Sequence, residues 1–104
     1  MGNEIIIEFI QHDRLHSEFD WANIVYNKEK VGRVRCIIES NALTIFSIKI
    51  FPEFQGLGYA SKFIEKVKKK YDIIIADRVR VTSSGFWSKM GFEQTDNGKW
   101  IYLK

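Results

Sequence analysis

The chain has 104 residues and a formal net charge of +3, with 45% hydrophobic and 28% charged residues. This composition excludes a disordered chain, and the length predicts one domain spanning residues 1–104. No apolar run reaches the roughly 20 residues of a membrane-spanning helix, and the N-terminus lacks the features of a secretory signal, so we expect a cytoplasmic protein. The single cysteine, Cys36, excludes an internal disulfide and a cysteine metal site, and we expect no bound metal.

The first half of the sequence predicts an antiparallel meander of strands. Residues 30–39 alternate with period two, with Cys36 on one face and Arg33 and Arg35 on the other, so we predict a strand in which Cys36 is a buried thiol. Residues 42–51 are apolar at nearly every position, which indicates a strand covered on both faces. The other expected elements are strands at residues 3–9 and 21–27, one or two helical turns at 12–19, and turns at 28–29 and 40–41.

A glycine turn follows the strand at 42–51 and leads into a helix. The apolar run stops at Pro52, the only proline, and Gly56-Leu57-Gly58 precedes a segment with helical spacing. The first turn of a helix leaves backbone N–H groups unpaired and partly positive, and glycines let an anion approach the backbone closely. The junction is therefore a candidate phosphate or pyrophosphate site, although a tight turn that binds nothing shows the same pattern. The apolar face of the expected helix consists of Ala60, Phe63, Ile64, Val67 and Tyr71.

The remaining sequence predicts a strand, a short helix and a hairpin. The expected elements are a strand at 72–77 that could continue to Val81, a helix at 82–90 capped by Thr82 or Ser83, and strands at 92–95 and 99–103. Asp96-Asn97-Gly98 between the last two strands favours a hairpin turn. A strand, a crossover helix and a second strand in one sheet imply a parallel pair. The expected fold class is therefore α+β, with a mixed and mostly antiparallel central sheet.

Two segments resemble motifs of the GNAT acetyltransferase family. Gln55-Gly56-Leu57-Gly58-Tyr59-Ala60 matches Q/R-x-x-G-x-G/A, the acyl-CoA pyrophosphate loop, and Phe86 to Glu93 resembles the family's F-Y-x-K-x-G-F segment. The two occur in the family's order and spacing, and the resemblance covers residues 43–104. It implies the GNAT-like acyl-CoA N-acyltransferase fold, in which two parallel strands, here 43–51 and 72–77, splay apart around the pantetheine arm of the cofactor.

The resemblance also implies that the cofactor is acetyl-CoA (coenzyme A) and which residues bind it. Amides of the strand would pair with pantetheine, amides of the turn and the helix start would bind the pyrophosphate, and Gln55 would sit at the loop entrance. Trp87 takes the position at which many family members carry a tyrosine that protonates the leaving thiolate, and an indole N–H is no practical proton donor. The expected cofactor-binding residues are Ile48, Lys49, Ile50, Gln55, Gly56, Leu57, Gly58, Tyr59, Ala60, Ser61 and Trp87.

The side chains that would move protons are less well defined. Acetyl transfer to an amine needs a deprotonated amine, a stabilised oxyanion and an acid for the thiolate. Glu39 is a candidate catalytic base, and Ser84 could orient a group through its hydroxyl. A solvated strand-end charge and a helix cap are the alternative interpretations of these two residues, and a water chain or an amine that arrives neutral would also serve.

We predict an acetyl-CoA-dependent N-acetyltransferase with an unidentified amine acceptor, and the alternative is a GNAT-like module that binds CoA or a partner without efficient turnover. Residues 12–19 stand where most family members place two helices that shape the acceptor pocket. The acceptor side would then be open, which suits a protein or peptide amine, or be completed by a second subunit in a homodimer. The five lysines between Lys62 and Lys70 could indicate nucleic acid, but the interruption by Glu65 favours a solvated helix face, so nucleic acid is the weaker interpretation.

Overall fold

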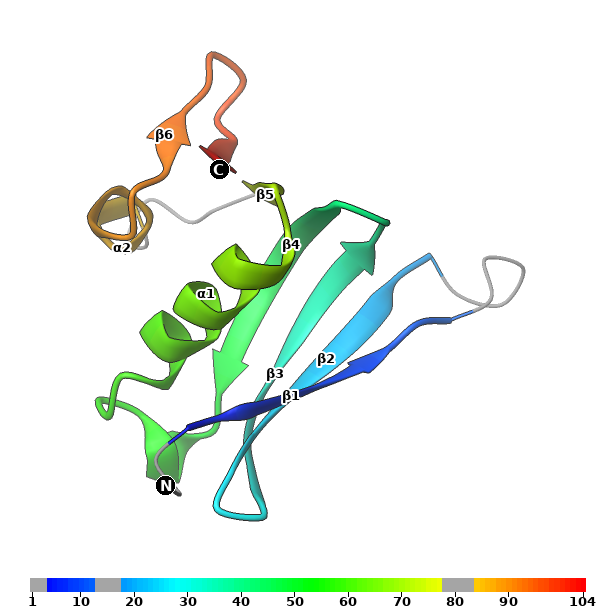
Figure 1. The fold of residues 1–104 in the computed structure, drawn as a ribbon. Helices are drawn as coiled ribbons and strands as arrows, with labels where there is room; N and C mark the ends of the chain where they lie inside the picture. The colour runs from blue at the N-terminus through cyan, green and yellow to red at the C-terminus, as the bar shows by residue number, and fades with distance from the viewer. Residues whose placement is uncertain (1–3, 13–17, 78–83) are drawn as a thin grey trace.

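The structure, a computed structural model, describes residues 4–12, 18–77 and 84–104, with the backbone alone described at Ser84 (Figure 1). Its strands form one sheet in the order β1-β2-β3-β4-β5-β7-β6, so the expected mixed α+β architecture is confirmed. None of the helices in these residues is long and apolar enough to cross a membrane. The elements are β1 (Ile6–Ile10), β2 (Asp20–Tyr26), β3 (Glu29–Ile38), β4 (Ala42–Ile50), the 3-10 helix η1 (Pro52–Phe54), α1 (Tyr59–Lys70), β5 (Ile73–Ala76), α2 (Ser84–Lys89), β6 (Glu93–Gln94) and β7 (Trp100–Leu103).

Strands β1 to β4 form the predicted antiparallel meander. The turn between β2 and β3 lies one residue earlier than expected, at Asn27 and Lys28, which both have positive φ angles of 55° and 66°. Two consecutive residues with positive φ match the twist of the flanking strands in a two-residue hairpin. Asparagine tolerates this conformation well, whereas lysine gives little sequence signal for it.

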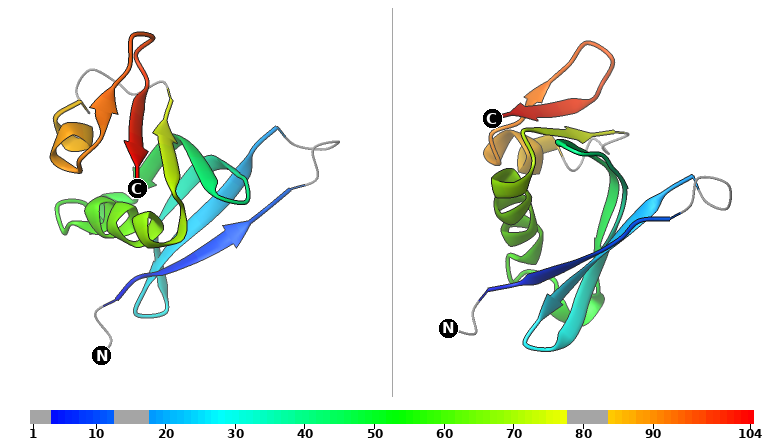
Figure 2. Two further views of the ribbon diagram at one scale, coloured as in Figure 1. Left: turned by 45° about the horizontal axis from the view of Figure 1, so that its top comes forward. Right: turned by 45° about the vertical axis from the view of Figure 1, so that its right-hand side comes forward.

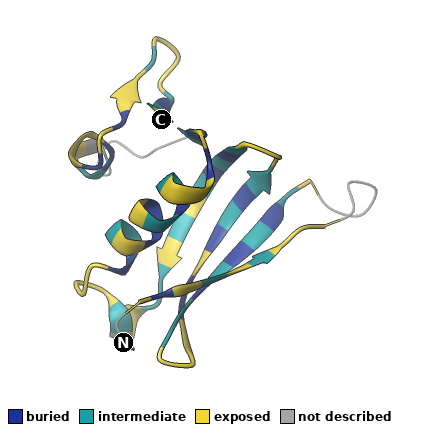
Figure 3. Cartoon of the chain, in the orientation of Figure 1, coloured by how far each residue is buried: buried dark blue, intermediate teal, exposed yellow. Residues whose placement is uncertain are grey.

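The core lies between one face of the sheet and helix α1. Along β2 and β3 buried residues alternate with exposed or half-buried ones, and the exposed residues of α1 point away from the sheet (Figure 3). The helix buries Phe63, Ile64 and Val67, as its spacing predicts, and it begins at Tyr59, which is also buried. Cys36 is fully buried on the same face of the sheet, so the predicted core thiol is confirmed.

Strand β4 changes the face of its side chains halfway along, at a β-bulge. Cys36 of β3 pairs with Ile45 and Arg35 pairs with Ser47, so Phe46 is the extra residue. An extra residue in one strand inverts the alternation beyond it, which leaves Ser47 and Lys49 exposed. The expectation that this strand is covered on both faces is therefore wrong, because its apolar composition reflects a change of face and not a second layer of helices.

The parallel pair β4–β5 is short and then opens. Pairing runs from Ala42↔Ile73 to Ile45↔Ala76, and the N–H of Asp77 donates to the carbonyl of Ile45 at 2.8 Å. Strand β4 continues to Ile50, and no described residue pairs with that side of it beyond this point. Figure 1 shows β4 running down to the glycine turn while β5 ends near the top of the molecule, so the edge of β4 from Ser47 to Ile50, the open edge, has no pairing strand among the described residues.

The C-terminal strands β7 and β6 extend the sheet beyond β5. Strand β7 pairs with both β5 and β6, and the predicted hairpin turn is confirmed by the bond from the Thr95 N–H to the Lys99 carbonyl at 2.7 Å. Helix α2 ends at Lys89, one residue earlier than expected, and Gly91 follows with a φ of 88°. The expected continuation of the strand to Val81, the caps Thr82 and Ser83, and most of the segment 12–19 lie outside the described residues.

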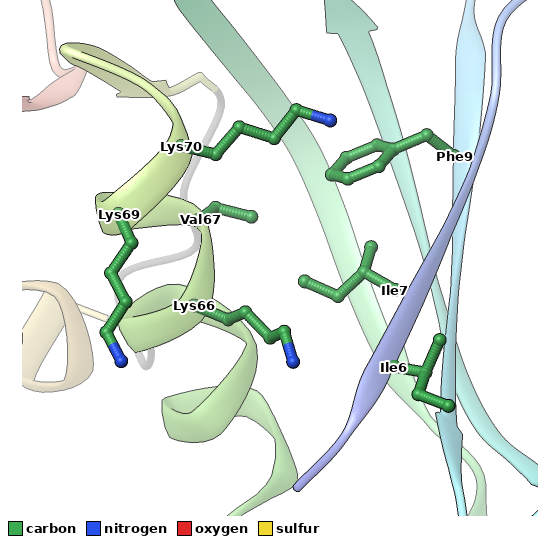
Figure 4. Close-up of a pocket in the computed structure, with 7 residues that line it drawn as sticks. All are labelled: Ile6, Ile7, Phe9, Lys66, Val67, Lys69 and Lys70. Carbon is green, nitrogen blue, oxygen red and sulfur yellow. The ribbon is translucent and has the colours of Figure 1, made fainter.

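Helix α1 and the edge strand β1 meet across a pocket of about 360 Å³ (Figure 4). Ile7 and Phe9 line it from β1, and Val67 and three lysine side chains line it from α1. Lys66 donates to the carbonyl of Ile5 at 2.7 Å, which ties the helix to β1, and Lys68 donates to the carbonyl of Met90. The interpretation of the lysines as a wholly solvated face is therefore wrong for these two, which stabilise tertiary contacts.

Candidate functional site

The candidate site is the glycine turn between η1 and α1. Gly56 and Gly58 have φ angles of 81° and 84°, and a side chain at either position would meet no atom within 4 Å. The requirement for glycine is therefore conformational, because left-handed φ costs other residues roughly 1–2 kcal/mol. The empty space around both residues leaves the backbone accessible to a ligand.

Six consecutive amide groups in this turn make no hydrogen bond to any described residue. Lys62 is the first residue of α1 whose N–H is satisfied within the helix, by the carbonyl of Gly58 at 3.0 Å. Gly58 is the N-cap and has no side chain to cap the helix. Unpaired amides at a helix N-terminus bind anions well, since the helix dipole adds positive potential. The six amides are those of Gly56, Leu57, Gly58, Tyr59, Ala60 and Ser61.

Contacts on both sides hold the turn in place. The side-chain amide of Gln55 donates to the carbonyl of Ile50 at 2.9 Å, which ties the loop entrance to the last residue of β4. The buried ring of Tyr59 packs against Phe54 and Tyr26, with ring centroids 6.4 Å and 5.3 Å apart. These contacts preorganise the amides, so a ligand would not have to order them.

The open edge of β4 leads directly to this turn. Ile48, Lys49 and Ile50 pair with β3 on one side only and form the last part of the open edge. At about 3.3 Å per residue, the four residues from Ser47 to Ile50 extend roughly 13 Å. An unpaired strand edge of this length offers successive N–H and C=O groups to a linear ligand that contains amides.

The charges near the turn favour an anion. Lys62 lies one turn into α1, with its Nζ 5.7 Å from the rings of Tyr26 and Tyr59. Lys49 is exposed on the end of β4, and the carboxylate nearby in the sequence is the exposed Glu53. The described residues contain no group of three His, Cys, Asp or Glu side chains that could hold a metal ion. The site is thus suited to a polyanion bound mainly by backbone amides.

The other predicted site residues do not gather at the turn. Trp87 is buried, with its ring 5.0 Å from Phe86 and 4.9 Å from Phe92, in a cluster of aromatic side chains. Glu39 is exposed and follows β3, whose last residue pairs with Leu43 near the start of β4. Leu43 and Ile50 are roughly 23 Å apart along the strand, so Glu39 lies far from the glycine turn. Ser84 begins α2, and its side chain is not described.

One buried carboxylate was not anticipated from the sequence. Asp20 is fully buried at the start of β2 and accepts hydrogen bonds from the N–H groups of His12 at 2.9 Å and Ile38 at 2.7 Å. These bonds join the end of β1 to the end of β3, so the role of Asp20 is structural. Its position before an alternating strand gives no signal of burial, because acidic residues commonly stand at strand ends.

Comparison with known proteins places this geometry in context. No family model matches the sequence. An uncharacterized N-acetyltransferase of Oceanobacillus iheyensis is 34% identical over 50 residues, which is 48% of this chain and 31% of that protein. The chain therefore matches less than a third of the length of this curated relative.

Solved structures match almost the whole chain. The Bacillus subtilis N-acetyltransferase YlbP, in complex with coenzyme A, has a TM-score of 0.69 at 15% identity, covering 96% of this chain and 97% of that one. The E. coli putative N-acetyltransferase YhhK, bound to coenzyme A, has a TM-score of 0.71 at 12% identity, with coverages of 97% and 99%. A chain of the KacTA–DNA complex has a TM-score of 0.69 at 14% identity, with coverages of 96% and 93%. The chain thus has the fold of the GNAT acetyltransferases, and the resemblance seen in its sequence is confirmed at the level of the fold.

Proposed function

We propose that the protein is an N-acetyltransferase that uses acetyl-CoA and transfers the acetyl group to an amine. The observation that carries the proposal is the run of six free amides, Gly56 to Ser61, at the end of the open edge of β4. Pyrophosphate fits the amides and the positive helix end, and the amide-containing pantetheine arm fits the strand edge. The structural relatives that hold coenzyme A support this choice of cofactor.

The reaction requires few side chains. A deprotonated amine attacks the thioester carbonyl carbon, a C–N bond forms, and the C–S bond breaks. Coenzyme A leaves as a thiolate and takes a proton, and the proton lost by the amine passes to solvent or a base. An N–H on the open edge of β4 would stabilise the carbonyl oxygen as it becomes negative. The described residues of this edge are Ser47, Ile48, Lys49 and Ile50.

A second candidate function is a CoA-binding module with little turnover. Trp87 in place of the family's tyrosine favours this alternative, because its indole ring is buried among aromatic side chains and supplies no acid. Glu39 follows Ile38, which pairs with Leu43, roughly 10 Å along β4 from the bulge at Phe46, so it would act on a thioester held there only through a bridging group. Turnover would then depend on water or on an amine with a low pKa.

Titration of the protein with acetyl-CoA and CoA in a calorimeter tests cofactor binding, and an assay of thiol release with amine acceptors tests turnover. We expect micromolar binding that is lost in Gly58→Glu, where a carboxylate would face the phosphates, and kept in Gly98→Glu. The second variant is a matched control because Gly98 has a similar φ of 81° and equally open surroundings. Binding that Gly58→Glu leaves unchanged would refute the proposed site, and binding without turnover would favour the second candidate.

Two further features remain proposals. We place the protein in the cytoplasm, as expected from the sequence. A homodimer that completes the acceptor side is consistent with the free edge of β1, because exposed strand edges can pair with a second chain. Sedimentation of the protein at two concentrations would test the dimer.

A further inference from the structure

The sheet face opposite α1 carries an ordered set of cationic and aromatic side chains. The right-hand view of Figure 2 shows α1 on one side of β1 to β4, and no described helix lies against the other side. Residues paired directly across neighbouring strands share a face. Two rows therefore cross the uncovered face, one formed by Trp21, Arg35 and Ser47, the other by Asn23, Arg33 and Lys49.

Aromatic rings hold both guanidinium groups. The guanidinium carbon of Arg33 lies 4.0 Å from the centre of the Trp21 ring, and that of Arg35 lies 4.8 Å from the centre of the Phe19 ring. The Phe19 ring in turn packs against Phe46 at 5.1 Å. A guanidinium stacked on a ring keeps its N–H donors at the edges free for a planar anion.

These cations lack the partners that charged groups on a protein surface commonly have. Arg33, Arg35 and Lys49 form no ion pair with any residue that the structure describes. The Nε atom of Arg35 is buried and has no hydrogen-bond partner there. A buried donor without a partner is uncommon in folded proteins, and it leaves the charge of Arg35 uncompensated by the described residues. The set is therefore complementary to an anion.

The set also lies beside the proposed reaction centre. Arg35 pairs with Ser47, the residue after the bulge, and Phe46 of the bulge supports the Phe19–Arg35 stack. The inner face at this position is filled by the core and α1, so an acceptor must reach the open edge of β4 from the uncovered face. The parts of the acceptor next to its reacting amine would thus lie over Arg33 and Arg35.

We propose that the acceptor is an acidic peptide, whose carboxylates pair with Arg33 and Arg35 while its amine reaches the open edge of β4. The proposal rests on the acetyltransferase function proposed above and adds the substrate class. Carboxylates match the paired donors of arginine, and a surface across three strands that no described helix covers fits an extended chain better than an enclosed small molecule.

The test compares two short peptides that each contain one lysine, flanked by glutamates in one and by serines in the other. We measure their binding by calorimetry in the presence of CoA, and their acetylation by thiol release from acetyl-CoA. We expect the acidic peptide to bind roughly tenfold more tightly or better, as one added charged hydrogen bond would give. In Arg33→Gln the KM for the acidic peptide should rise by a similar factor, with kcat and the affinity for CoA unchanged.

The matched control is Lys69→Gln, which removes one exposed charge from α1 on the opposite side of the sheet. It should leave the preference for the acidic peptide intact. Equal binding of the two peptides by wild-type protein that binds CoA overturns the inference and leaves the proposed function in place. Tighter, Arg33-dependent binding of a single-stranded oligonucleotide would also overturn it, since the face would then serve nucleic acid. If the wild-type protein does not bind CoA, the result refutes the proposed function itself.

Discussion

The sharpest prediction of the site concerns Gly58→Ala, because the structure separates its effect on stability from its effect on the cofactor. Gly58 has a φ of 84°, and an added Cβ would meet no atom within 4 Å. The cost to the free energy of unfolding is therefore backbone strain alone, about 1–2 kcal/mol. If the backbone relaxes instead, the Gly58 and Tyr59 amides turn away from the bound phosphates.

The expected loss of cofactor affinity follows from the number of amides displaced. A hydrogen bond to a charged group contributes about 1.5–3 kcal/mol, so loss of one amide–phosphate bond weakens CoA binding roughly ten- to a hundredfold. Isothermal calorimetry with CoA gives the affinity, and urea denaturation gives the stability. Both are measured on the same preparations.

Two other glycines make this measurement decisive. Gly98→Ala creates the same strain in the β6–β7 turn, where φ is 81°, so it should lose similar stability and keep its CoA affinity. Gly85→Ala lies in α2, at a position without positive φ, and should gain up to about 1 kcal/mol because alanine favours helix. If Gly58→Ala and Gly98→Ala bind CoA equally well, the amides of the turn do not hold the phosphates and our reasoning is wrong.

Three further predictions concern stability. Lys66→Met should cost about 1 kcal/mol in urea denaturation, because it removes the hydrogen bond to Ile5 that ties α1 to β1; an unchanged midpoint would show that the bond adds nothing. Asp20→Asn should cost roughly 2–4 kcal/mol by the same measurement, because an amide cannot accept both backbone bonds, and a loss below 1 kcal/mol would contradict the clamp. Burial, with smaller contributions from the neighbouring Cys36 and Asp20, raises the pKa of Tyr71 above 10.0. The unfolded chain therefore loses that proton first, and stability should fall as the pH rises above about 10, less steeply in Tyr71→Phe than in wild type.

The sequence predicted those parts of the fold that depend on local patterns. Period-two alternation located β3 and the burial of Cys36, and helical spacing located the buried face of α1. The glycine turn was predictable because glycine adopts left-handed φ more readily than any other residue, so the motif carries its own conformational reason. Assignment of the cofactor loop itself remains a prediction.

The features that escaped prediction depend on neighbours distant in the sequence. The bulge at Phe46 exists only relative to the pairing of β3 with β4, and an apolar run gives no sign of it. The roles of Lys66 and Lys68 depend on carbonyl groups in β1 and beyond α2. The separation of Glu39 from the glycine turn likewise follows from the direction of β3, which residue type alone does not reveal.

The extra residue at Phe46 gives β4 two separate tasks within one run of nine residues. Leu43 and Ile45 before it face the core, and Ser47 and Lys49 after it face solvent. Deletion of Phe46 would remove the bulge and make Ile45 and Ser47 neighbours in a regular strand, so the second half of β4 would keep its present pairing and Lys49 would still face solvent. Insertion of one further residue beside Phe46 would instead turn the second half of the strand over and send Lys49 towards the core, so β4 should tolerate the loss of a residue here better than a gain.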